Sequence, residues 1–441
     1  MCPCACRPGR RRGQERGEVM TVRGMECDDG IMQGFPPPLD KQVARGGGLR
    51  PPFMRWALSH TREVAPTVGM RHAAQPMPLP VASDDAGEHL DDIPLTVGGA
   101  SMQLDQYLKA THTDGFLVAH CGHIVYERYC GGIHAHQPHI WASMTKSVTG
   151  LLAAMLVSEG RLDPQAPLHR YVPELAGNPF GDATVQRNLD MEVSVGYPPA
   201  LPPDLGLFAA VGILPRKDDA PDNIYDFLKV AHATGTHDDA PVWYYQNGSA
   251  EAVAWALRRI TGQRWSQLVT DRLWSRFADD DAYTSVDRLG TEMASGGLNS
   301  TLRDAARFAE TVRRAMQGDV SGPVSPDVAR ILFQPADNHA RFARGNLVSG
   351  RDGYGYRHYW FQCNDGDGSV EASGRFGQRL YINPTQSLVA VKFSSSPDDA
   401  ARPTHAAEIQ RRDDPARVLE TSAALTAAVT AIHESVIRHR S

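Results

Sequence analysis

The sequence predicts an α/β fold in which an antiparallel sheet is flanked by helices and interrupted by a helical domain. Short apolar runs with β-branched and aromatic residues lie near both ends of the chain, at 116–129 and 354–393, whereas helical periodicity prevails over 181–289. This order predicts an α/β domain with a central antiparallel sheet, made of residues 51–180 and 290–441, and a mostly helical insertion domain at 181–289.

Individual elements follow from periodicity and turn residues. Two hairpins are expected, one from Phe116–Ala119 and Ile124–Tyr129, the other from Arg379–Ile382 and Ser387–Phe393. A further strand is expected at Tyr354–Phe361. Helices are expected at Met102–Leu108, Asn223–Val230, Ser249–Ile260, Ser266–Phe277 and about Pro415–Ile437. The proline-rich segment Gly196–Asp222 is interpreted as a loop that forms a cleft wall or lid.

Composition excludes several classes of function. The chain has 441 residues, of which 41% are hydrophobic and 22% charged, as is ordinary for a globular protein. A net charge of −6 gives no electrostatic reason to expect nucleic acid or an anionic membrane as a partner. No apolar run approaches the roughly 20 residues of a membrane span. Seven cysteines are too few for a disulfide scaffold in a chain of this size, so we expect a cytoplasmic protein.

The first fifty residues differ from the rest. Cys2, Cys4 and Cys6 precede three arginines, and no apolar segment follows, so a secretory signal does not fit. A Cys-x-Cys-x-Cys pattern suggests a metal site, but proline and glycine runs continue the composition of a linker. We therefore expect residues 1–50 to be a disordered tail, or the product of a start codon assigned too far upstream.

The segment Trp141–Ser147 contains a Ser-x-x-Lys motif at the start of an apolar, buried helix. Ser143 and Lys146 are three residues apart, so on a helix they share one face, with Cβ atoms about 5–6 Å apart. A serine hydroxyl needs a neighbouring base to become a nucleophile. A lysine in a desolvated cleft is such a base, because burial lowers the pKa of an ammonium group. The alternative is a helix cap with a surface lysine.

Two further segments carry candidate chemistry. Tyr245 and Asn247 lie just before an expected helix, where a tyrosine near serine and lysine can relay a proton; aromatic core packing is the alternative. In Gly374–Gln378, glycine lets the backbone approach a ligand, so a main-chain N–H could complete an oxyanion hole. An ordinary glycine turn is the alternative.

His134, His136 and His139 suggest a metal, but no cysteine or carboxylate at ligand spacing completes a site, so no metal is expected.

The order of these motifs resembles that of β-lactamase-like serine hydrolases: Ser-x-x-Lys, Tyr-x-Asn roughly a hundred residues later, then a glycine before a strand. The chain resembles the branch of penicillin-binding-protein-like esterases (family VIII carboxylesterases) and 6-aminohexanoate-dimer hydrolase. The similarity extends from about Pro51 onward. It rests on Arg55–Ala57, Ser143–Ser147, Val172–Gly177, Leu189–Met191, Gly296–Gly297, Arg303–Asp304 and Phe376–Gln378.

The resemblance implies a β-lactamase/transpeptidase-like fold and a set of roles. Ser143 would be the acylated nucleophile, Lys146 its base and Tyr245 the relay of the proton to the leaving group. The backbone N–H of Ser143 and one from Gly374 or Arg375, with Arg375 preferred, would form the oxyanion hole. Asn247 and Phe376 would contact the substrate. No metal or organic cofactor is implied.

Three departures from the family pattern bear on the substrate. Ala372–Gly374 stands where β-lactamases carry Lys-Thr-Gly, so a cation that would hold a β-lactam carboxylate is missing. Tyr197–Pro203 stands where 6-aminohexanoate-dimer hydrolase, which acts on nylon oligomers, has a tyrosine and acidic residues that contact the substrate. Phe376 replaces a histidine and makes the pocket more apolar. Together these changes favour ester or hydrophobic acyl substrates.

Other classes of protein stay open. A non-hydrolytic binding or sensor protein on the same fold, or a weak β-lactamase, would share these motifs. A Ser-His-Asp hydrolase is disfavoured, because the chain has no Gly-x-Ser-x-Gly elbow. The expected partner is a small ester or amide, without nucleic acid or membrane, and a homodimer is left open.

Overall fold

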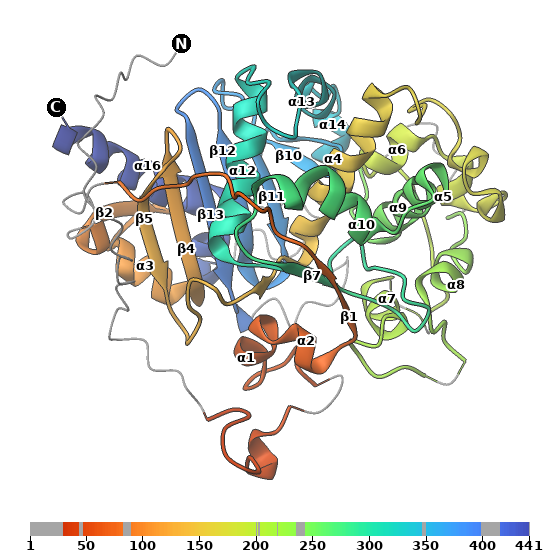
Figure 1. Ribbon diagram of the computed structural model, residues 1–441, viewed down its shortest axis with the longest axis horizontal. Helices are drawn as coiled ribbons and strands as arrows, with labels where there is room; N and C mark the ends of the chain where they lie inside the picture. Colours follow the sequence, from red (N-terminus) through yellow and green to blue (C-terminus); the bar gives the residue numbers. More distant parts are fainter. Residues whose placement is uncertain are drawn as a thin grey trace.

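The computed structural model describes residues 30–43, 47–82, 90–199, 201, 203–217, 219–234, 243–345, 350–397 and 415–440. Its centre is a seven-stranded antiparallel sheet in the order β5-β4-β13-β12-β11-β10-β9 (Figure 1). The strands are β4 (Thr113–His120), β5 (His123–Tyr129), β9 (Gly355–Arg357), β10 (Trp360–Gln362), β11 (Val370–Gly374), β12 (Gln378–Asn383) and β13 (Leu388–Ser394). Because β4 pairs with β13, the sheet joins the first and last parts of the chain.

Both predicted hairpins are confirmed, as β4–β5 and β12–β13. The single strand predicted at Tyr354–Phe361 is wrong, because the segment folds back on itself as β9 and β10. His358 and Tyr359 make this turn with φ of 48° and 66°, in the left-handed region. Nothing in this aromatic-rich segment distinguishes a tight turn of two bulky residues from a continuous strand.

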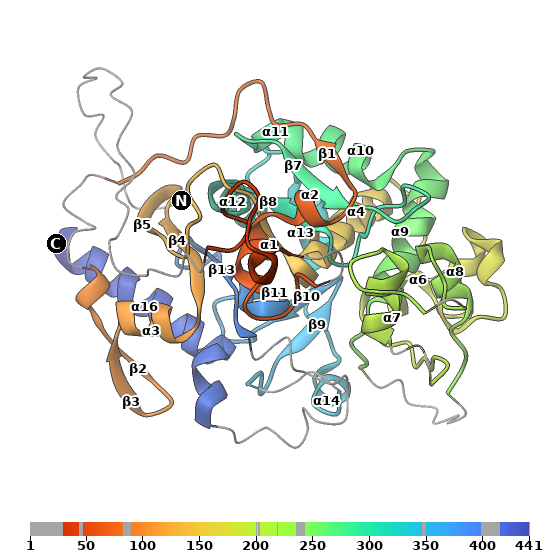
Figure 2. The same cartoon turned by 90° about the horizontal axis from the view of Figure 1, so that it is seen from below.

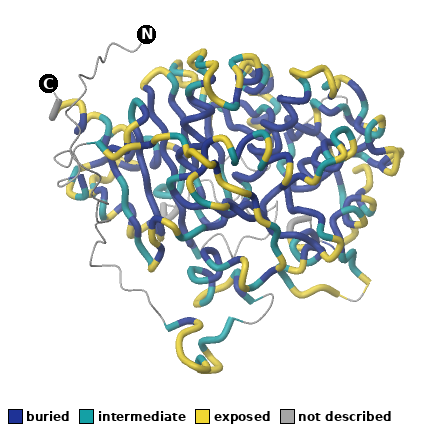
Figure 3. The backbone as a smooth tube through the Cα atoms, viewed as in Figure 1, coloured by how far each residue is buried: buried dark blue, intermediate teal, exposed yellow. Residues whose placement is uncertain are grey.

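Alternation along the strands gives the sheet two buried faces. Leu117, Leu380 and Val391 lie in the cluster that includes α4 (Thr145–Ser158) and α12 (Leu302–Met316). On the other face, Phe116, Val118 and Tyr381 pack with α3 (Leu104–Ala110) and α16 (Ser422–Arg440). In Figures 1 and 2, α3 and α16 lie together at the left, and Figure 3 shows β4 and β13 buried along their lengths. Each large apolar side chain buried this way contributes roughly 1.5–3 kcal/mol.

A second, four-stranded sheet has the order β1-β7-β8-β6. Its strands are β1 (Thr67–Met70), β6 (His139–Ile140), β7 (Ala282–Ser285) and β8 (Leu298–Ser300). Strand β6 leads directly into Trp141–Ser147, and β8 follows Gly297, so this sheet supports two segments of the site. Strand structure thus resumes at Ala282, before the boundary predicted at residue 290.

The middle of the chain is rich in helices, most of which lie at the right of Figures 1 and 2. They are α5 (Pro179–Asp182), α6 (Val185–Leu189), α7 (Pro203–Ala210), α8 (Ile224–Lys229), α9 (Gly248–Thr261), α10 (Trp265–Val269), a π-helical turn (Thr270–Trp274) and α11 (Ser275–Phe277). The helices predicted at 223–230, 249–260 and 266–277 are confirmed. The segment interpreted as a loop contains α7, because proline is tolerated in the first turn of a helix and Leu207 provides a buried anchor.

The predicted helix at Met102–Leu108 is partly wrong. Met102 belongs to β3 (Ala100–Gln103), which pairs with β2 (Pro94–Val97), and α3 begins only at Leu104. A reciprocal capping box between Gln103 and Gln106 sets that start. The last predicted helix also begins later, since Pro415–Glu420 is a 3₁₀ turn before α16.

The remaining helices are short or peripheral. They are α1 (Met54–Ser59), α2 (Thr61–Val64), α13 (Pro326–Phe333), α14 (His339–Phe342) and 3₁₀ turns at Leu39–Lys41, Leu90–Asp92, Ala142–Met144, Leu168–Arg170, Pro173–Leu175 and Arg375–Gly377. The tail predicted at 1–50 lies outside the described residues except for 30–43 and 47–50. Within the described ranges, no helix is both long enough and apolar enough to cross a membrane.

Candidate active site

Ser143 is half-buried and sits in the 3₁₀ turn Ala142–Met144, immediately before α4. The preceding residue, Ala142, has φ of 46°, a strained conformation for alanine. Trp141 anchors the turn, because its backbone N–H donates to Leu298 O (2.8 Å) and its indole Nε1 donates to Ser300 Oγ (2.8 Å). Buried anchors on β8 therefore hold Ala142, directly before Ser143, in a conformation that alanine disfavours.

Lys146 is 1% exposed and lies one turn into the same helical segment. Its Nζ is 2.8 Å from Ser143 Oγ, which confirms that the two side chains share a face. The same Nζ donates to Asn247 Oδ1 (2.7 Å) and to Ser295 O (2.8 Å). Distances of this size between a hydroxyl and a basic nitrogen are those of an activated nucleophile and its base.

Tyr245 faces Lys146 from the segment before α9. The centroid of its ring is 5.0 Å from Lys146 Nζ. The ring also packs near Trp243 and Tyr356, with centroids 5.9 and 6.3 Å away. Tyr245 is thus both part of an aromatic cluster and a neighbour of the lysine, so the two interpretations of this tyrosine are compatible.

Gly374 ends β11 against the Ser143 turn. A Cβ atom on this residue would lie 2.4 Å from Trp141 O and 3.0 Å from Ser143 N. No side chain fits there, which is the close backbone approach expected of this glycine. The main chain of β11 and that of the Ser143 turn are therefore in contact, as an oxyanion hole made of two backbone N–H groups requires.

Arg375 and Phe376 follow Gly374 and point to different surroundings. The guanidinium carbon of Arg375 is 5.9 Å from the ring centroid of Phe208, so this side chain reaches from the sheet to α7. Phe376 is 4% exposed and packs with Met54, Leu58 and Ile140. The Phe376 side chain thus packs against α1 and β6. Its contact with substrate stays a prediction.

Two residues that support Lys146 were missed in the sequence. Ser295, which precedes the Gly296–Gly297 pair, supplies the carbonyl that accepts from Lys146. Glu251 is fully buried and accepts from Ser295 N (2.8 Å) and Ala294 N (3.3 Å). Burial raises the pKa of Glu251, opposed by its hydrogen bond with Ser295 and by the charges of Arg258 and Lys146. Its position four residues after Asn247, on the same helix face, is the signal that could have revealed it.

Arg351 places a cation where the sequence suggested that one is missing. It is 7% exposed, and its Nη2 donates to Ser373 Oγ (3.0 Å), within the triplet Ala372–Gly374. Its guanidinium stacks 4.0 Å from the ring centroid of Phe361, and no carboxylate of the described residues lies within 4.0 Å. Burial lowers the pKa of Arg351, and the nearby charge of Arg379 lowers it further. The triplet itself carries no lysine, as the sequence indicated, but Arg351, which is distant in sequence, brings a cation beside it.

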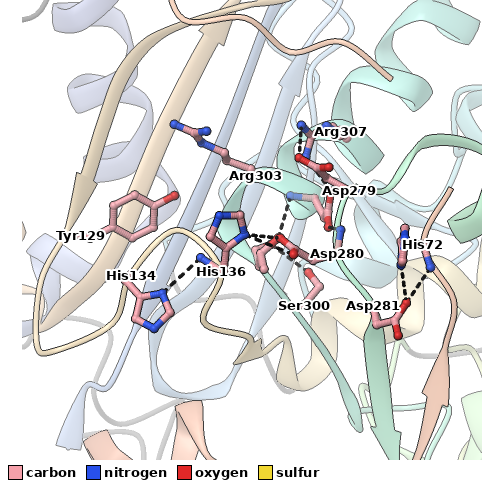
Figure 4. A network of polar contacts seen from close by, with 12 residues as sticks. His72, Tyr129, His134, His136, Asp279, Asp280, Asp281, Ser300, Arg303 and Arg307 are labelled. Atoms are coloured by element: carbon pink, nitrogen blue, oxygen red, sulfur yellow. Dashed lines mark hydrogen bonds and ion pairs between the residues drawn. The ribbon is translucent and has the colours of Figure 1, made fainter. Parts of the chain in front are cut away.

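The three histidines before the motif have protein partners. His136 points at Asp280 in Figure 4, with Nδ1 3.1 Å from Oδ2, and its backbone N–H donates to His134 Nδ1 (3.3 Å). His139 is buried beside Asp114 (3.3 Å). Across the described ranges, no group of three or more His, Cys, Asp or Glu residues has the arrangement of a metal site.

A half-buried serine bonded to a buried lysine at a helix start, beside an antiparallel sheet with helices on both faces, defines a class: serine hydrolases with the β-lactamase fold. The family model described as Beta-lactamase matches residues 103–413. The chain therefore belongs to the β-lactamase family, and it is a serine hydrolase.

Individual relatives agree with this assignment. A 6-aminohexanoate-dimer hydrolase from Paenarthrobacter ureafaciens is 31% identical over 365 residues, which are 80% of this chain and 88% of that protein. A solved structure from Bacillus anthracis, with the provisional name 6-aminohexanoate-dimer hydrolase, is 32% identical and has a TM-score of 0.72 over 87% of this chain and 98% of that one. A family VIII carboxylesterase shares the fold, with a TM-score of 0.51 at 14% identity over 75% of this chain and 97% of that one.

Proposed function

We propose that the protein hydrolyses small ester or amide substrates through an acyl-enzyme on Ser143, with Lys146 as general base and Tyr245 as proton relay. The observation that carries this proposal is the 2.8 Å hydrogen bond between Lys146 Nζ and Ser143 Oγ in a buried setting. The names of the relatives, which include a dimer hydrolase and a carboxylesterase, support the same class of reaction.

The partners of Lys146 suit a neutral amine. A neutral amine has two N–H donors and one lone pair. If the donors go to Asn247 Oδ1 and Ser295 O, the lone pair is left facing the Ser143 hydroxyl. The base is thereby oriented without any movement, which is the preorganisation that general base catalysis needs.

The reaction then proceeds in two halves. Ser143 Oγ attacks the carbonyl carbon while its proton passes to Lys146, and backbone N–H groups of Ser143 and Arg375 bind the oxyanion. The intermediate collapses as Tyr245 delivers a proton to the leaving oxygen or nitrogen, and Lys146 returns a proton to Tyr245. Water repeats the sequence on the acyl-enzyme, which releases the acid and restores Ser143.

Covalent labelling tests these roles. We would measure the intact mass after a fluorophosphonate probe for the wild type, Ser143→Ala and Lys146→Ala, with Ser147→Ala as matched control. Ser147 is buried one residue beyond Lys146, and its Oγ donates to Tyr359 O (2.8 Å), so its loss perturbs the same helix without touching the site. A single adduct on Ser143, absent in Ser143→Ala and slowed in Lys146→Ala but not in Ser147→Ala, is expected. Equal labelling of Ser143→Ala would refute the assignment.

The substrate is tested with matched pairs. On the wild type, p-nitrophenyl butyrate and butyryl p-nitroanilide compare an ester with an amide of the same acyl group. We expect the ester to be cleaved faster, and robust cleavage of the anilide alone would overturn the preference for esters.

A weak β-lactamase activity is the second candidate function, because Arg351 brings a cation to Ser373. Turnover of nitrocefin that is lost in Ser143→Ala would support it.

A further inference from the structure

We propose that Glu251 is a positioning residue for the general base: it holds the Ser295 carbonyl on Lys146, and its negative charge stabilises the protonated lysine. This inference rests on the proposed role of Lys146 as the base. Glu251 lies on α9, a helix that also carries Asn247 at its N-terminal end.

The first part of the argument is geometric. The carboxylate of Glu251 accepts from two successive backbone N–H groups, those of Ala294 and Ser295. On the opposite side, Thr149 Oγ1 of α4 donates to Ala294 O (2.8 Å). The peptide between Ala294 and Ser295 is thus held from α9 and from α4, and the Ser295 carbonyl that accepts from Lys146 follows directly after it.

The second part concerns what α9 delivers to Lys146. Asn247 and Glu251 are four residues apart, so they project from the same face of the helix. Asn247 bonds Lys146 directly, whereas Glu251 holds the other acceptor, Ser295, by the backbone N–H of that residue. A displacement of Glu251 would therefore release one of the two oxygens that orient the lone pair of Lys146.

The third part is electrostatic. Glu251 is fully buried, and the charges that act on it are those of Arg258 and Lys146. Arg258 also has a carboxylate partner of its own, because its Nε is 3.3 Å from Glu292 Oε2. Lys146 is faced by Ser143, Asn247, the Ser295 carbonyl and the ring of Tyr245, none of which is negatively charged while the tyrosine is protonated. Glu251, one residue beyond these contacts, is therefore a buried source of negative charge that acts on the lysine.

This charge has opposite effects on two steps. When Ser143 loses its proton, Lys146 becomes an ammonium ion in a site of low dielectric, where a nearby negative charge acts strongly. Glu251 therefore favours the proton transfer. In the resting enzyme the same charge favours protonated Lys146, which cannot act as a base. The acidic limb of the pH profile, where kcat/KM falls as the pH is lowered, therefore lies at higher pH than it would without Glu251. A residue that only filled space would not move that limb.

The test is the pH dependence of kcat/KM for a p-nitrophenyl ester in Glu251→Gln, which keeps an oxygen acceptor but removes the charge. We expect the acidic limb to move to lower pH by about one unit, and the plateau to fall by roughly 10- to 100-fold. The matched control is Glu310→Gln on α12, a buried carboxylate that pairs with Arg313 and Arg314, which should leave the limb in place.

Further variants keep the proposal falsifiable. Glu251→Asp retains the charge on a shorter side chain, so its limb should stay near that of the wild type while the plateau falls. A limb that does not move in Glu251→Gln, or a Glu251→Asp limb displaced to lower pH by about one unit, would overturn the proposal. Phosphonate labelling of Ser143 that still depends on Lys146 would show that the base assignment survives, so the two failures are distinguishable.

Discussion

Lys392 is a second buried lysine, and replacing it with methionine should stabilise the protein. It lies on β13, is 4% exposed, and its Nζ donates to Ser394 Oγ (2.6 Å) and Thr111 O (3.4 Å). No carboxylate of the described residues lies within 4.0 Å of this ammonium group. Burial lowers the pKa of Lys392 from 10.5 to about 7, and the charge of Arg379 acts in the same direction.

The size of the effect follows from that pKa. A fall from 10.5 to about 7 is about 3.5 units, and at 1.36 kcal/mol per unit it corresponds to an upper bound of about 5 kcal/mol of lost stability. The Lys392→Met substitution removes this loss but leaves a buried Ser394 hydroxyl without its partner, at about 1–3 kcal/mol. We therefore expect a net stabilisation of at most roughly 2–4 kcal/mol at pH 7.

The pH dependence has a definite sign. Between pH 7 and 10.5 the unfolded chain holds a proton on Lys392 that the folded protein does not, so wild-type stability rises with pH by up to about 1.4 kcal/mol per unit. Below pH 7 both states are protonated, and the difference between wild type and variant is constant and largest. Towards pH 10.5 the electrostatic part disappears, and the cost of the unpaired Ser394 hydroxyl remains.

Urea unfolding at pH 6, 7, 8 and 9 measures this difference directly. The control is Lys109→Met, because the Lys109 side chain is 47% exposed and pairs with Asp105 on the surface of α3. For the control the free energy of unfolding should differ little from the wild type at every pH. A gap between wild type and Lys392→Met that is the same at pH 6 and pH 9 would refute the reasoning, whatever its sign.

Three further predictions concern the site. Gly374→Ala should lower kcat/KM by roughly 10²–10³-fold, as the loss of one oxyanion donor does. The reason is that the new Cβ would lie 2.4 Å from Trp141 O and push β11 away from the Ser143 turn. An unchanged kcat/KM would place the oxyanion hole elsewhere. Tyr245→Phe should slow an alkyl ester far more than a p-nitrophenyl ester, whose leaving group needs no proton; equal losses would argue against a relay. Arg351→Met should reduce kcat/KM for mono-p-nitrophenyl glutarate relative to p-nitrophenyl butyrate by roughly 10-fold, as the loss of a charge-assisted hydrogen bond does. Arg128→Met, on the far edge of the sheet, is its control, and the same ratio in both variants would contradict the prediction.

Local spacing determined the elements on which the site is built. A helix places residues three apart on one face, so Ser143 and Lys146 could be paired from the sequence alone. Alternating apolar residues around short turns likewise identified β4–β5 and β12–β13. The same reasoning failed at His358 and Tyr359, where a turn requires two residues in the left-handed region, and at Met102, where a capping box begins the helix later than periodicity suggests.

Only the tertiary structure decided what surrounds the lysine. Asn247 and Ser295 are 101 and 149 residues from Lys146, and they reach it because α9 and the turn before β8 pack on α4. Arg351 reaches Ser373 in the same way, across a separation of 22 residues. Contacts within one element depend on backbone geometry that every helix or strand shares, so residue spacing predicts them. Contacts between elements depend on which apolar faces are buried together across the whole chain, and no local pattern in the sequence specifies that choice.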